Sequence, residues 1–230
     1  MTTRAVEDYL KCILVEEQGL DAGRVSTGRI AQSLGLAPGT VTAMLQALAE
    51  AGRVDYAPYG GVRLTADGRR QALHVLRRHR LIELFLVEVL GFDWSEVHDE
   101  AERLEHAVSD RLVDRIDEML GRPESDPHGD PIPDAQGELR GGELSPLDGV
   151  AIGGRFRVAR VADQDAAFLR SIENLGLAPG ARFRLVAREA ATDTVELELS
   201  RGRRVSLGSR AAAKLWVAPA QRSGAKRARQ

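Results

Sequence analysis

Residues 97–110, VHDEAERLEHAVSD, decide how the rest of this chain is interpreted. On one helix, expected over residues 96–109, the ligand-type side chains at i, i+4, i+7 and i+8 share a face; they are His98, Glu102, Glu105 and His106. Imidazole nitrogens and carboxylate oxygens without sulfur suit a divalent ion such as Mn²⁺, Fe²⁺ or Zn²⁺. A solvated acidic surface is the alternative, but histidines on the same stripe as carboxylates favour a metal site.

The preceding segment adds two further ligand-type residues. A helix expected over residues 67–90 carries His79 and Glu83, which are four residues apart and therefore point to the same side. The single cysteine, Cys12, excludes a multi-cysteine site and is interpreted as a buried thiol rather than a ligand. His128, in a loop rich in Pro, Gly and Asp, is interpreted as structural.

Toward the N-terminus the pattern is that of a winged helix-turn-helix. Helices are expected over residues 6–15, 27–34 and 38–50, followed by hairpin strands at 53–57 and 62–65. The third helix begins with small and hydroxyl-bearing residues, which suit contacts with phosphate and entry into the major groove. A helical hairpin that binds protein is the alternative. The residues expected at DNA are Ser26, Thr27, Ala37, Pro38, Gly39, Thr40, Thr42 and Ala43.

Toward the C-terminus the pattern changes to short strands, which predict a small β-barrel. The fold class is therefore mainly α with small β: a winged helix-turn-helix, a helical dimerisation domain and an SH3-like barrel. The strands are expected at residues 155–161, 182–188, 194–199 and 203–207. The expected domains are residues 1–73, 74–142 and 143–218, with a basic disordered tail at 219–230.

Composition limits the class of protein. The chain has 230 residues, of which 43% are hydrophobic and 29% charged, and its mean hydropathy is −0.25. No apolar run approaches the roughly 18 residues of a membrane span, and the first residues lack the apolar core of a signal peptide. With one cysteine, these features predict a cytoplasmic protein with no membrane partner. Residues 81–142 hold 17 acidic against 5 basic residues, which is consistent with a cation site.

Four segments resemble the diphtheria-toxin-repressor family of metal-dependent transcriptional regulators: LAPGTVTAML, HRLIELFL, VHDEAERLEHAVSD and HGDPIP. The C-terminal strands are similar to the SH3-like domain of that family, mainly through LRSIENLGLAPGARF. The resemblance implies a homodimer, not an enzyme, that binds double-stranded operator DNA when loaded with divalent metal. It also implies two metal sites per subunit.

The resemblance also implies the ligands of each site. The primary site takes Asp8, Glu102, Glu105 and His106. The ancillary site takes His79, Glu83, His98 and one residue of the stretch 163–165, for which Asp165 is favoured.

The identity of the metal follows from two of these positions. Iron-regulated members carry methionine and cysteine where this chain has Asp8 and Glu102, and the oxygen ligands favour Mn²⁺. Lys11 stands where compact manganese regulators have a glutamate, which disfavours a dinuclear centre. An iron-responsive regulator is the alternative within the family. A helical carboxylate metalloenzyme is the alternative outside it, although the chain lacks a second Glu-x-x-His.

Overall fold

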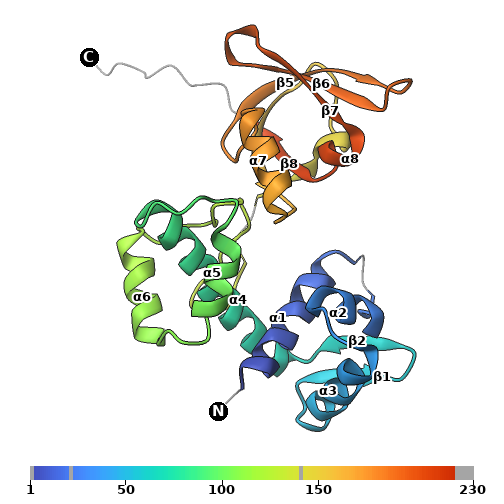
Figure 1. Ribbon diagram of the computed structural model, residues 1–230, viewed down its shortest axis with the longest axis vertical. Helices are drawn as coiled ribbons and strands as arrows, with labels where there is room; N and C mark the ends of the chain where they lie inside the picture. Colours follow the sequence, from blue (N-terminus) through green and yellow to red (C-terminus); the bar gives the residue numbers. More distant parts are fainter. Residues whose placement is uncertain (1–2, 21–22, 140–141, 221–230) are drawn as a thin grey trace. The chain divides into compact units, whose positions relative to one another are not determined.

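The structure is a computed structural model that describes residues 3–20, 23–139 and 142–220, traced in chain order in Figure 1. The chain divides into two units, each with a hydrophobic core of its own. Within the described residues, unit 1 comprises residues 3–20, 23–82, 102–119 and 132–139, and unit 2 comprises residues 83–101, 120–131 and 142–220. The domain limits at residues 73, 142 and 218 stay predictions. Residues 221–230 of the predicted tail lie outside the described residues.

The N-terminal part of unit 1 is a winged helix-turn-helix, as expected. The backbone N–H of Arg29 donates to Ser26 Oγ at 3.3 Å, and Gly35 ends the second helix in the left-handed conformation at φ 63°. Pro38 opens the third helix, where its missing N–H costs nothing. The elements are α1 (Arg4–Gln18), α2 (Thr27–Leu34), α3 (Pro38–Glu50), β1 (Val54–Ala57) and β2 (Gly61–Leu64).

One side of α1 belongs to the core of unit 1. Leu10, Ile13 and Leu14 are fully buried, and burial of each such side chain contributes about 1.5–3 kcal/mol. They share this core with Val41 and Leu45 of α3. Cys12 is also buried here, and burial raises the pKa of its thiol to about 11, in keeping with a packing role. Helices α1 and α3 therefore contribute to the same hydrophobic core.

Three further helices follow, and one differs from the expectation. They are α4 (Ala66–Glu88), α5 (Val97–Leu104) and α6 (Asp110–Met119). The expected single helix over residues 96–109 is wrong, because α5 ends at Leu104 and a turn follows, in which the N–H of Ala107 donates to the Leu104 carbonyl at 2.9 Å. Glu105 and His106 therefore lie beyond the helix. The Glu105 carboxylate is fully buried against Lys11 and His79.

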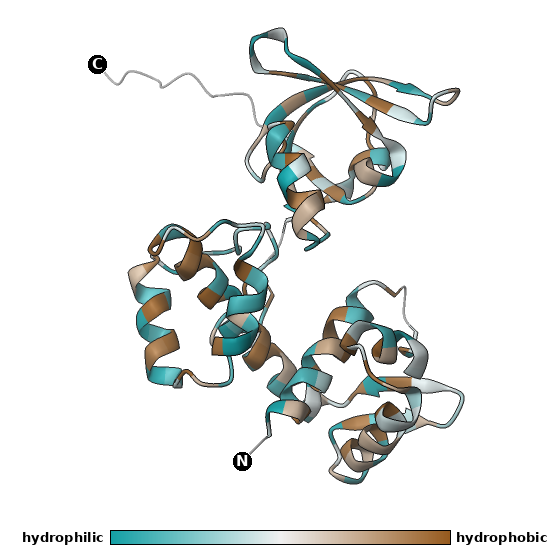
Figure 2. Ribbon diagram, in the orientation of Figure 1, coloured by the Kyte–Doolittle hydropathy of each residue, from teal (hydrophilic) through white to brown (hydrophobic). Residues whose placement is uncertain are grey.

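Helix α6 is amphipathic, and Figure 2 shows hydrophobic and hydrophilic residues alternating along it. Val113 and Ile116 are buried, whereas Leu112 and Met119 are exposed. Among the described helices, none combines the length and the apolar composition that crossing a membrane requires.

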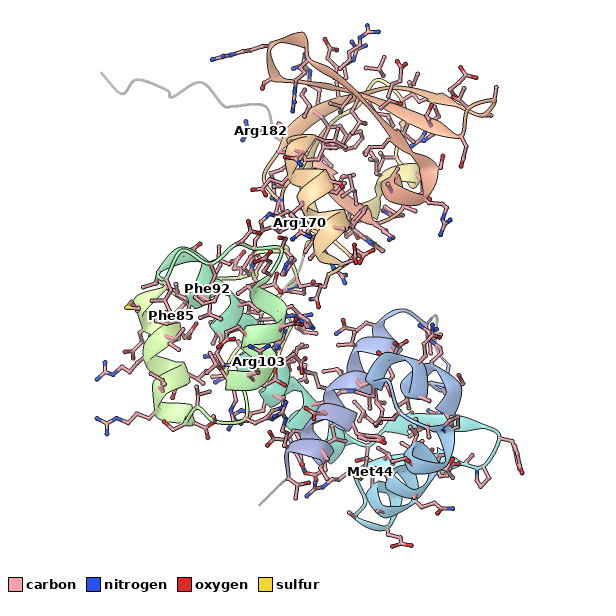
Figure 3. The ribbon with its side chains drawn as sticks, in the orientation of Figure 1. Met44, Phe85, Phe92, Arg103, Arg170 and Arg182 are labelled. Carbon is pink, nitrogen blue, oxygen red and sulfur yellow. The ribbon has the colours of Figure 1, made fainter. Side chains whose placement is uncertain are left out.

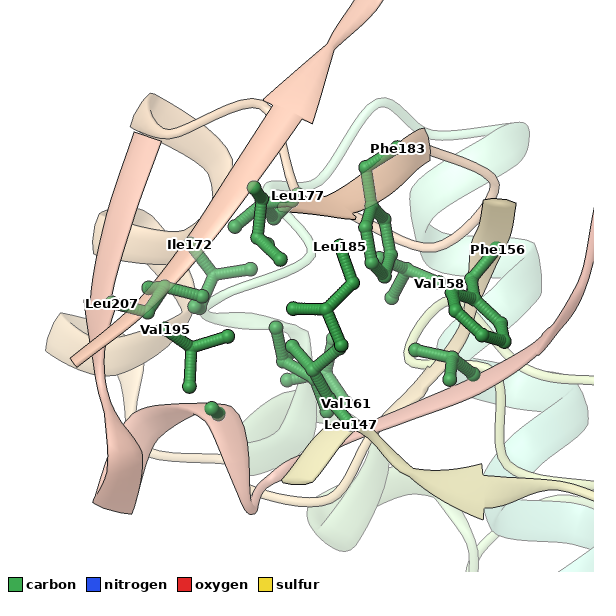
Figure 4. Close-up of a cluster of buried hydrophobic side chains, with 14 of the residues drawn as sticks. Leu147, Phe156, Val158, Val161, Ile172, Leu177, Phe183, Leu185, Val195 and Leu207 are labelled. Carbon is green, nitrogen blue, oxygen red and sulfur yellow. The ribbon is translucent and has the colours of Figure 1, made fainter. Parts of the chain in front are cut away.

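Unit 2 contains the C-terminal barrel. Its six strands are hydrogen-bonded in the order β3-β8-β4-β5-β6-β7, and all the pairings are antiparallel. The inward-facing residues of the alternating strands form the core shown in Figure 4, where Val158, Leu185 and Val195 meet. The elements are β3 (Ser145–Pro146), η1 (Leu147–Gly149), β4 (Arg155–Val161), α7 (Ala166–Asn174), β5 (Arg182–Glu189), β6 (Thr194–Leu199), η2 (Ser200–Gly202), β7 (Arg204–Gly208), α8 (Ser209–Ala212) and β8 (Leu215–Pro219).

Candidate metal centre and DNA-binding helix

Three of the predicted primary ligands meet inside unit 1. Asp8 comes from α1, and Glu105 and His106 come from the turn after α5. Each offers a ligand atom, and these atoms lie within 4.8 Å of one another. The His106 Nε2 atom is 2.8 Å from Asp8 Oδ1 and 3.1 Å from Glu105 Oε1. The structure therefore brings together an imidazole nitrogen and two carboxylates, a set of donors that suits a divalent ion.

The orientation of these atoms fits a bound cation. His106 Nε2 and Asp8 Oδ1 are both buried and lie 2.8 Å apart, but their relative orientation does not have the geometry of a hydrogen bond. Buried polar atoms are normally hydrogen-bonded. A nitrogen and a carboxylate oxygen that lie this close without a hydrogen bond between them have the arrangement expected of two ligands of one metal ion. The residues present thus fit the divalent metal that the resemblance implies.

Glu7 holds the histidine in this orientation. The His106 Nδ1 atom is 2.7 Å from Glu7 Oε2, so the ring N–H donates to a carboxylate on one side and presents Nε2 on the other. A carboxylate behind a ligating histidine is the usual means of orienting the ring and raising its basicity. Sequence reasoning missed Glu7, because nothing in the spacing along α1 distinguishes it from a solvated glutamate.

Glu102 contacts Lys11 in this structure. Lys11 Nζ is 2.5 Å from Glu102 Oε1 and 2.7 Å from Glu105 Oε1, and the lysine is only 8% exposed. Glu102 also forms a potential metal-binding group with His79 and Glu105. The ammonium group supplies positive charge between two carboxylates that are predicted ligands.

The carboxylates of the cluster differ in their affinity for protons. Burial raises the pKa of Asp8, and the nearby charge of Glu102 adds to this, while His106 and Lys11 oppose it. Burial acts in the same direction on Glu105, but the hydrogen bond from His79 and the charge of Lys11 outweigh it, so its pKa lies below its usual value. Glu105 is therefore held ionised by its partners.

Replacement of Lys11 by methionine is expected to strengthen binding of Mn²⁺ at this site by about tenfold. The ammonium repels an incoming cation and occupies two carboxylates that the cation needs, and such pairs carry several kcal/mol near a protein surface. The dissociation constant is measured by calorimetric titration, with Lys214→Met in the barrel as the control. Unchanged or weaker binding would show that Lys11 instead holds the carboxylates in place for the metal.

Three of the predicted ancillary ligands lie on α4 and α5. Glu83 and His98 meet in unit 2, with His98 Nδ1 3.2 Å from Glu83 Oε1. His79 lies one turn before Glu83 on α4 and therefore on the same side of that helix. Its Nδ1 atom is 2.6 Å from Glu105 Oε2, which links His79 to the first cluster. Sequence spacing did not reveal this second contact.

Asp165 is placed at the beginning of α7. The backbone N–H of Phe168 donates to Asp165 Oδ1 at 2.8 Å, so the side chain caps that helix. Asp163 pairs with Lys214. In the part of the chain that the structure describes, the groups that could hold a metal include neither aspartate. Asp165 as an ancillary ligand stays a prediction.

The first turn of α3 is open to solvent, as DNA binding requires. Gly39, Thr40 and Ala43 are exposed, and Thr42 is half-buried with its hydroxyl donating to the Pro38 carbonyl at 3.0 Å. Ser26, Thr27, Ala37 and Pro38 are likewise exposed or half-buried. Figure 3 shows the side chains of α3, with Met44 labelled further along the helix. The buried residues Val41, Leu45 and Leu48 anchor the opposite side of the helix.

Comparison with known proteins identifies the family to which this chain belongs. Residues 1–62 match the N-terminal DNA-binding domain of iron-dependent repressors, and residues 65–134 match their metal-binding and dimerisation domain. The HTH-type transcriptional regulator MntR of Bacillus pumilus is 37% identical over 122 residues, which cover 52% of this chain and 81% of that protein. The chain belongs to the iron-dependent repressor family, that of the diphtheria toxin repressor. Residues 145–219 match the FeoA domain.

Some relatives of this chain are named as iron-dependent repressors, and others are named as manganese-dependent repressors. The iron-dependent repressor IdeR of Mycobacterium leprae is 38% identical over 128 residues, or 55% of this chain, and the match spans about half (54%) of its length. A solved manganese-dependent transcriptional repressor in complex with manganese is 43% identical, with a TM-score of 0.86. That comparison covers 94% of this chain and 100% of the other.

Membership of the family confirms several expectations. The chain is a metal-dependent transcriptional repressor with a helical DNA-binding domain, a helical dimerisation domain and an SH3-like FeoA domain. It is not an enzyme, and the helical carboxylate metalloenzyme is excluded.

Proposed function

We propose that this repressor responds to Mn²⁺ and binds operator DNA as a metal-loaded homodimer in the cytoplasm, where it controls genes of metal homeostasis. The observation that carries the choice of Mn²⁺ is the chemistry of the donors: Asp8 groups with Glu105 and His106, and Glu102 groups with His79 and Glu105, so in the described part of the chain these groups hold carboxylates and imidazoles without sulfur. Hard oxygen ligands suit Mn²⁺, which gains least from sulfur. The iron-dependent relatives keep Fe²⁺ as the alternative.

The connection to DNA follows from the position of Asp8. A bound divalent ion supplies the positive charge that neutralises the clustered carboxylates. Asp8 is on α1, and the adjacent Leu10, Ile13 and Leu14 are buried in the core that also holds α3. A restraint on Asp8 therefore acts on the helix that presents Thr40 to DNA, and metal shifts the population toward the DNA-competent form.

Two further parts of the proposal rest on separate observations. A homodimer is supported by the exposed Leu112 and Met119 of the amphipathic α6, which lies within the matched dimerisation domain. Two ions per chain are supported by the pairing of Glu83 with His98 apart from the group of Asp8, Glu105 and His106.

The operator is found by selecting genomic DNA fragments on the immobilised full chain in Mn²⁺ and eluting them with a chelator. The proposal expects enrichment of a short palindromic sequence, because a two-fold dimer binds two half-sites. Recovery of the same fragments without any metal would contradict metal dependence.

The metal preference is tested by the double change Asp8→Met and Glu102→Cys. This replaces two hard oxygens by a thioether and a thiolate and removes negative charge that attracts a dication. We expect the variant to lose its Mn²⁺ response by at least about tenfold and to keep or gain a response to Fe²⁺ or Co²⁺. The measurement is the anaerobic metal concentration at half-maximal operator binding. An unchanged Mn²⁺ midpoint would show that neither residue binds the regulatory ion.

A further inference from the structure

The outer surface of the barrel carries a group of arginines that neither the metal centre nor helix α3 uses. Exposed and buried positions alternate along β4 and β5, and Figure 4 shows the buried Phe156 and Phe183 among the side chains of the core. Neighbouring residues of a strand point to opposite sides of a sheet, so the residues that flank these phenylalanines point outward. They form what we call the arginine face: Arg155, Arg157, Arg182 and Arg184.

Within this face, arginine lies opposite arginine. The antiparallel register places Arg155 opposite Arg184 and Arg157 opposite Arg182. The Cβ atoms of directly opposite residues are about 5 Å apart, and like charges in such positions destabilise a sheet. A surface that serves only solubility would pair opposite charges, as Arg184 does with Glu198 of β6 at 3.6 Å. The face therefore concentrates positive charge although this lowers the stability of the barrel.

Three of the four guanidinium groups are available to an anion. Among the residues that the structure describes, no side-chain hydrogen bond or ion pair involves Arg155, Arg157 or Arg182. Figure 3 labels Arg182, which is exposed on the barrel. Strands β4 and β5 are inner strands of the six-stranded sheet, so their charges do not protect an open sheet edge. An anionic partner from outside the barrel would satisfy these groups.

The chemistry of the face fits a polyanion with phosphate groups. Residues two apart on a strand are about 7 Å apart, so several guanidinium groups are presented over a short distance. Guanidinium matches the geometry of phosphate through two parallel hydrogen bonds. The last described residue, Ala220, donates its N–H to the Arg155 carbonyl at 3.0 Å. The sequence after it, residues 221–230, contains no acidic residue and adds the basic residues Arg222, Lys226, Arg227 and Arg229.

We infer that the arginine face binds the phosphate backbone of duplex DNA, as a second DNA contact of the chain besides α3. The family of this repressor has a DNA-binding domain, so duplex DNA is a polyanion that the protein meets. The inference rests on DNA binding as stated in the proposed function. Contacts with phosphate carry no sequence information, so the face adds affinity and salt dependence and leaves the choice of operator to α3. An acidic protein surface is the competing occupant, and it would leave DNA binding unchanged.

The test measures DNA binding by the full chain in Mn²⁺ at several salt concentrations, with operator DNA and with an unrelated duplex of equal length. The logarithm of the affinity falls with the logarithm of the salt concentration, with a slope of about 0.9 per phosphate contacted. The combined change of Arg155, Arg157 and Arg182 to glutamine is expected to reduce this slope by about 2–3 and to weaken binding at least about tenfold at physiological salt. The ratio of the two affinities is expected to stay as in wild type.

Two control variants separate the face from net charge. The combined change to glutamine at three exposed positions outside the face removes the same charge and is expected to keep the wild-type slope; the positions are Arg111, Arg122 and Arg210. Lysine at the three positions of the face keeps the charge and is also expected to keep the slope. Because glutamine removes facing like charges, the unfolding temperature of the face variant is expected to be no lower than that of wild type.

The outcomes for the inference and for the proposed function are distinct. A wild-type slope in the glutamine variant of the face, or an equal decrease in the variant of Arg111, Arg122 and Arg210, would overturn the inference. Wild type that binds the operator equally with and without Mn²⁺ would overturn the proposed function instead, and the slope on the unrelated duplex would still test the face.

A second measurement locates the contact. Cys12 is the single cysteine and is buried, so the variant Arg182→Cys supplies an accessible thiol at the face. Labelled with a photoreactive maleimide, this variant is expected to crosslink to bound DNA on illumination. Arg210→Cys, labelled in the same way at an exposed position of α8, is expected to give little crosslinking. Equal yields from both variants, or none from Arg182→Cys, would contradict a DNA contact at this face.

Discussion

Replacement of His106 by alanine is expected to weaken Mn²⁺ binding at the primary site at least about 100-fold and to abolish metal-dependent DNA binding. Loss of a partner behind a ligand typically costs 10–100-fold in metal affinity, and loss of the ligand itself costs more. His106 Nε2 lies 2.8 Å from an oxygen of Asp8 and 3.1 Å from an oxygen of Glu105, so its removal leaves these two carboxylates without their third donor. The measurement is calorimetric titration of the metal-free chain with Mn²⁺.

Two companion variants make this result specific. Glu7→Gln is expected to lose about tenfold in affinity, because the amide orients the ring less strongly than the carboxylate 2.7 Å from His106 Nδ1. His74→Ala removes an exposed histidine of α4 that pairs with Asp110, and it is expected to leave binding unchanged. If the His106→Ala variant binds Mn²⁺ with the affinity of wild type, His106 is not a ligand of this site.

Replacement of Thr40 by glutamate is expected to weaken operator binding at least about 100-fold while metal binding stays as in wild type. Thr40 is exposed in the first turn of α3, where a carboxylate would face the phosphates of the DNA. A negative charge near a helix N-terminus stabilises the helix, so the loss would not come from unfolding. The measurement is the dissociation constant for operator DNA at a fixed salt concentration.

The matched control for this change is Thr192→Glu. It introduces the same side chain and the same net charge at an exposed position between β5 and β6. We expect it to bind DNA within about twofold of wild type, since the long-range effect of one exposed charge is largely screened. Equal losses in both variants would show that net charge, and not the α3 contact, explains the effect.

Local patterns predicted those parts of the structure that depend on residues close in sequence. Ser26, Gly35 and Pro38 mark helix boundaries, and the alternation in residues 155–161 and 194–199 marks strands, because caps and pleats are local. The resemblance to the family then placed Asp8 with Glu105 and His106, a grouping that the structure contains. The spacing of residues within α1 does not by itself indicate that Asp8 lies beside Glu105 and His106.

The remaining contacts depend on tertiary packing and have no local signal. Lys11 meets Glu102 from 91 positions away, and Glu7 meets His106 from 99 positions away. The end of α5 at Leu104 and the burial of Glu105 directly after it are likewise not marked by a capping residue or a proline in the sequence. The second contact of His79 and the contact of His128 with the Trp94 carbonyl also became visible only in the structure.

The central claim is that divalent metal controls DNA binding through the cluster of Asp8, Glu105 and His106. Its most direct test is the fluorescence anisotropy of labelled operator DNA while Mn²⁺ is titrated into the metal-free full chain. The proposal predicts little binding without metal, a rise to saturation as Mn²⁺ is added, and return to the free-DNA value when a chelator removes it. Equal affinity for the operator with Mn²⁺ and with excess chelator would contradict the claim.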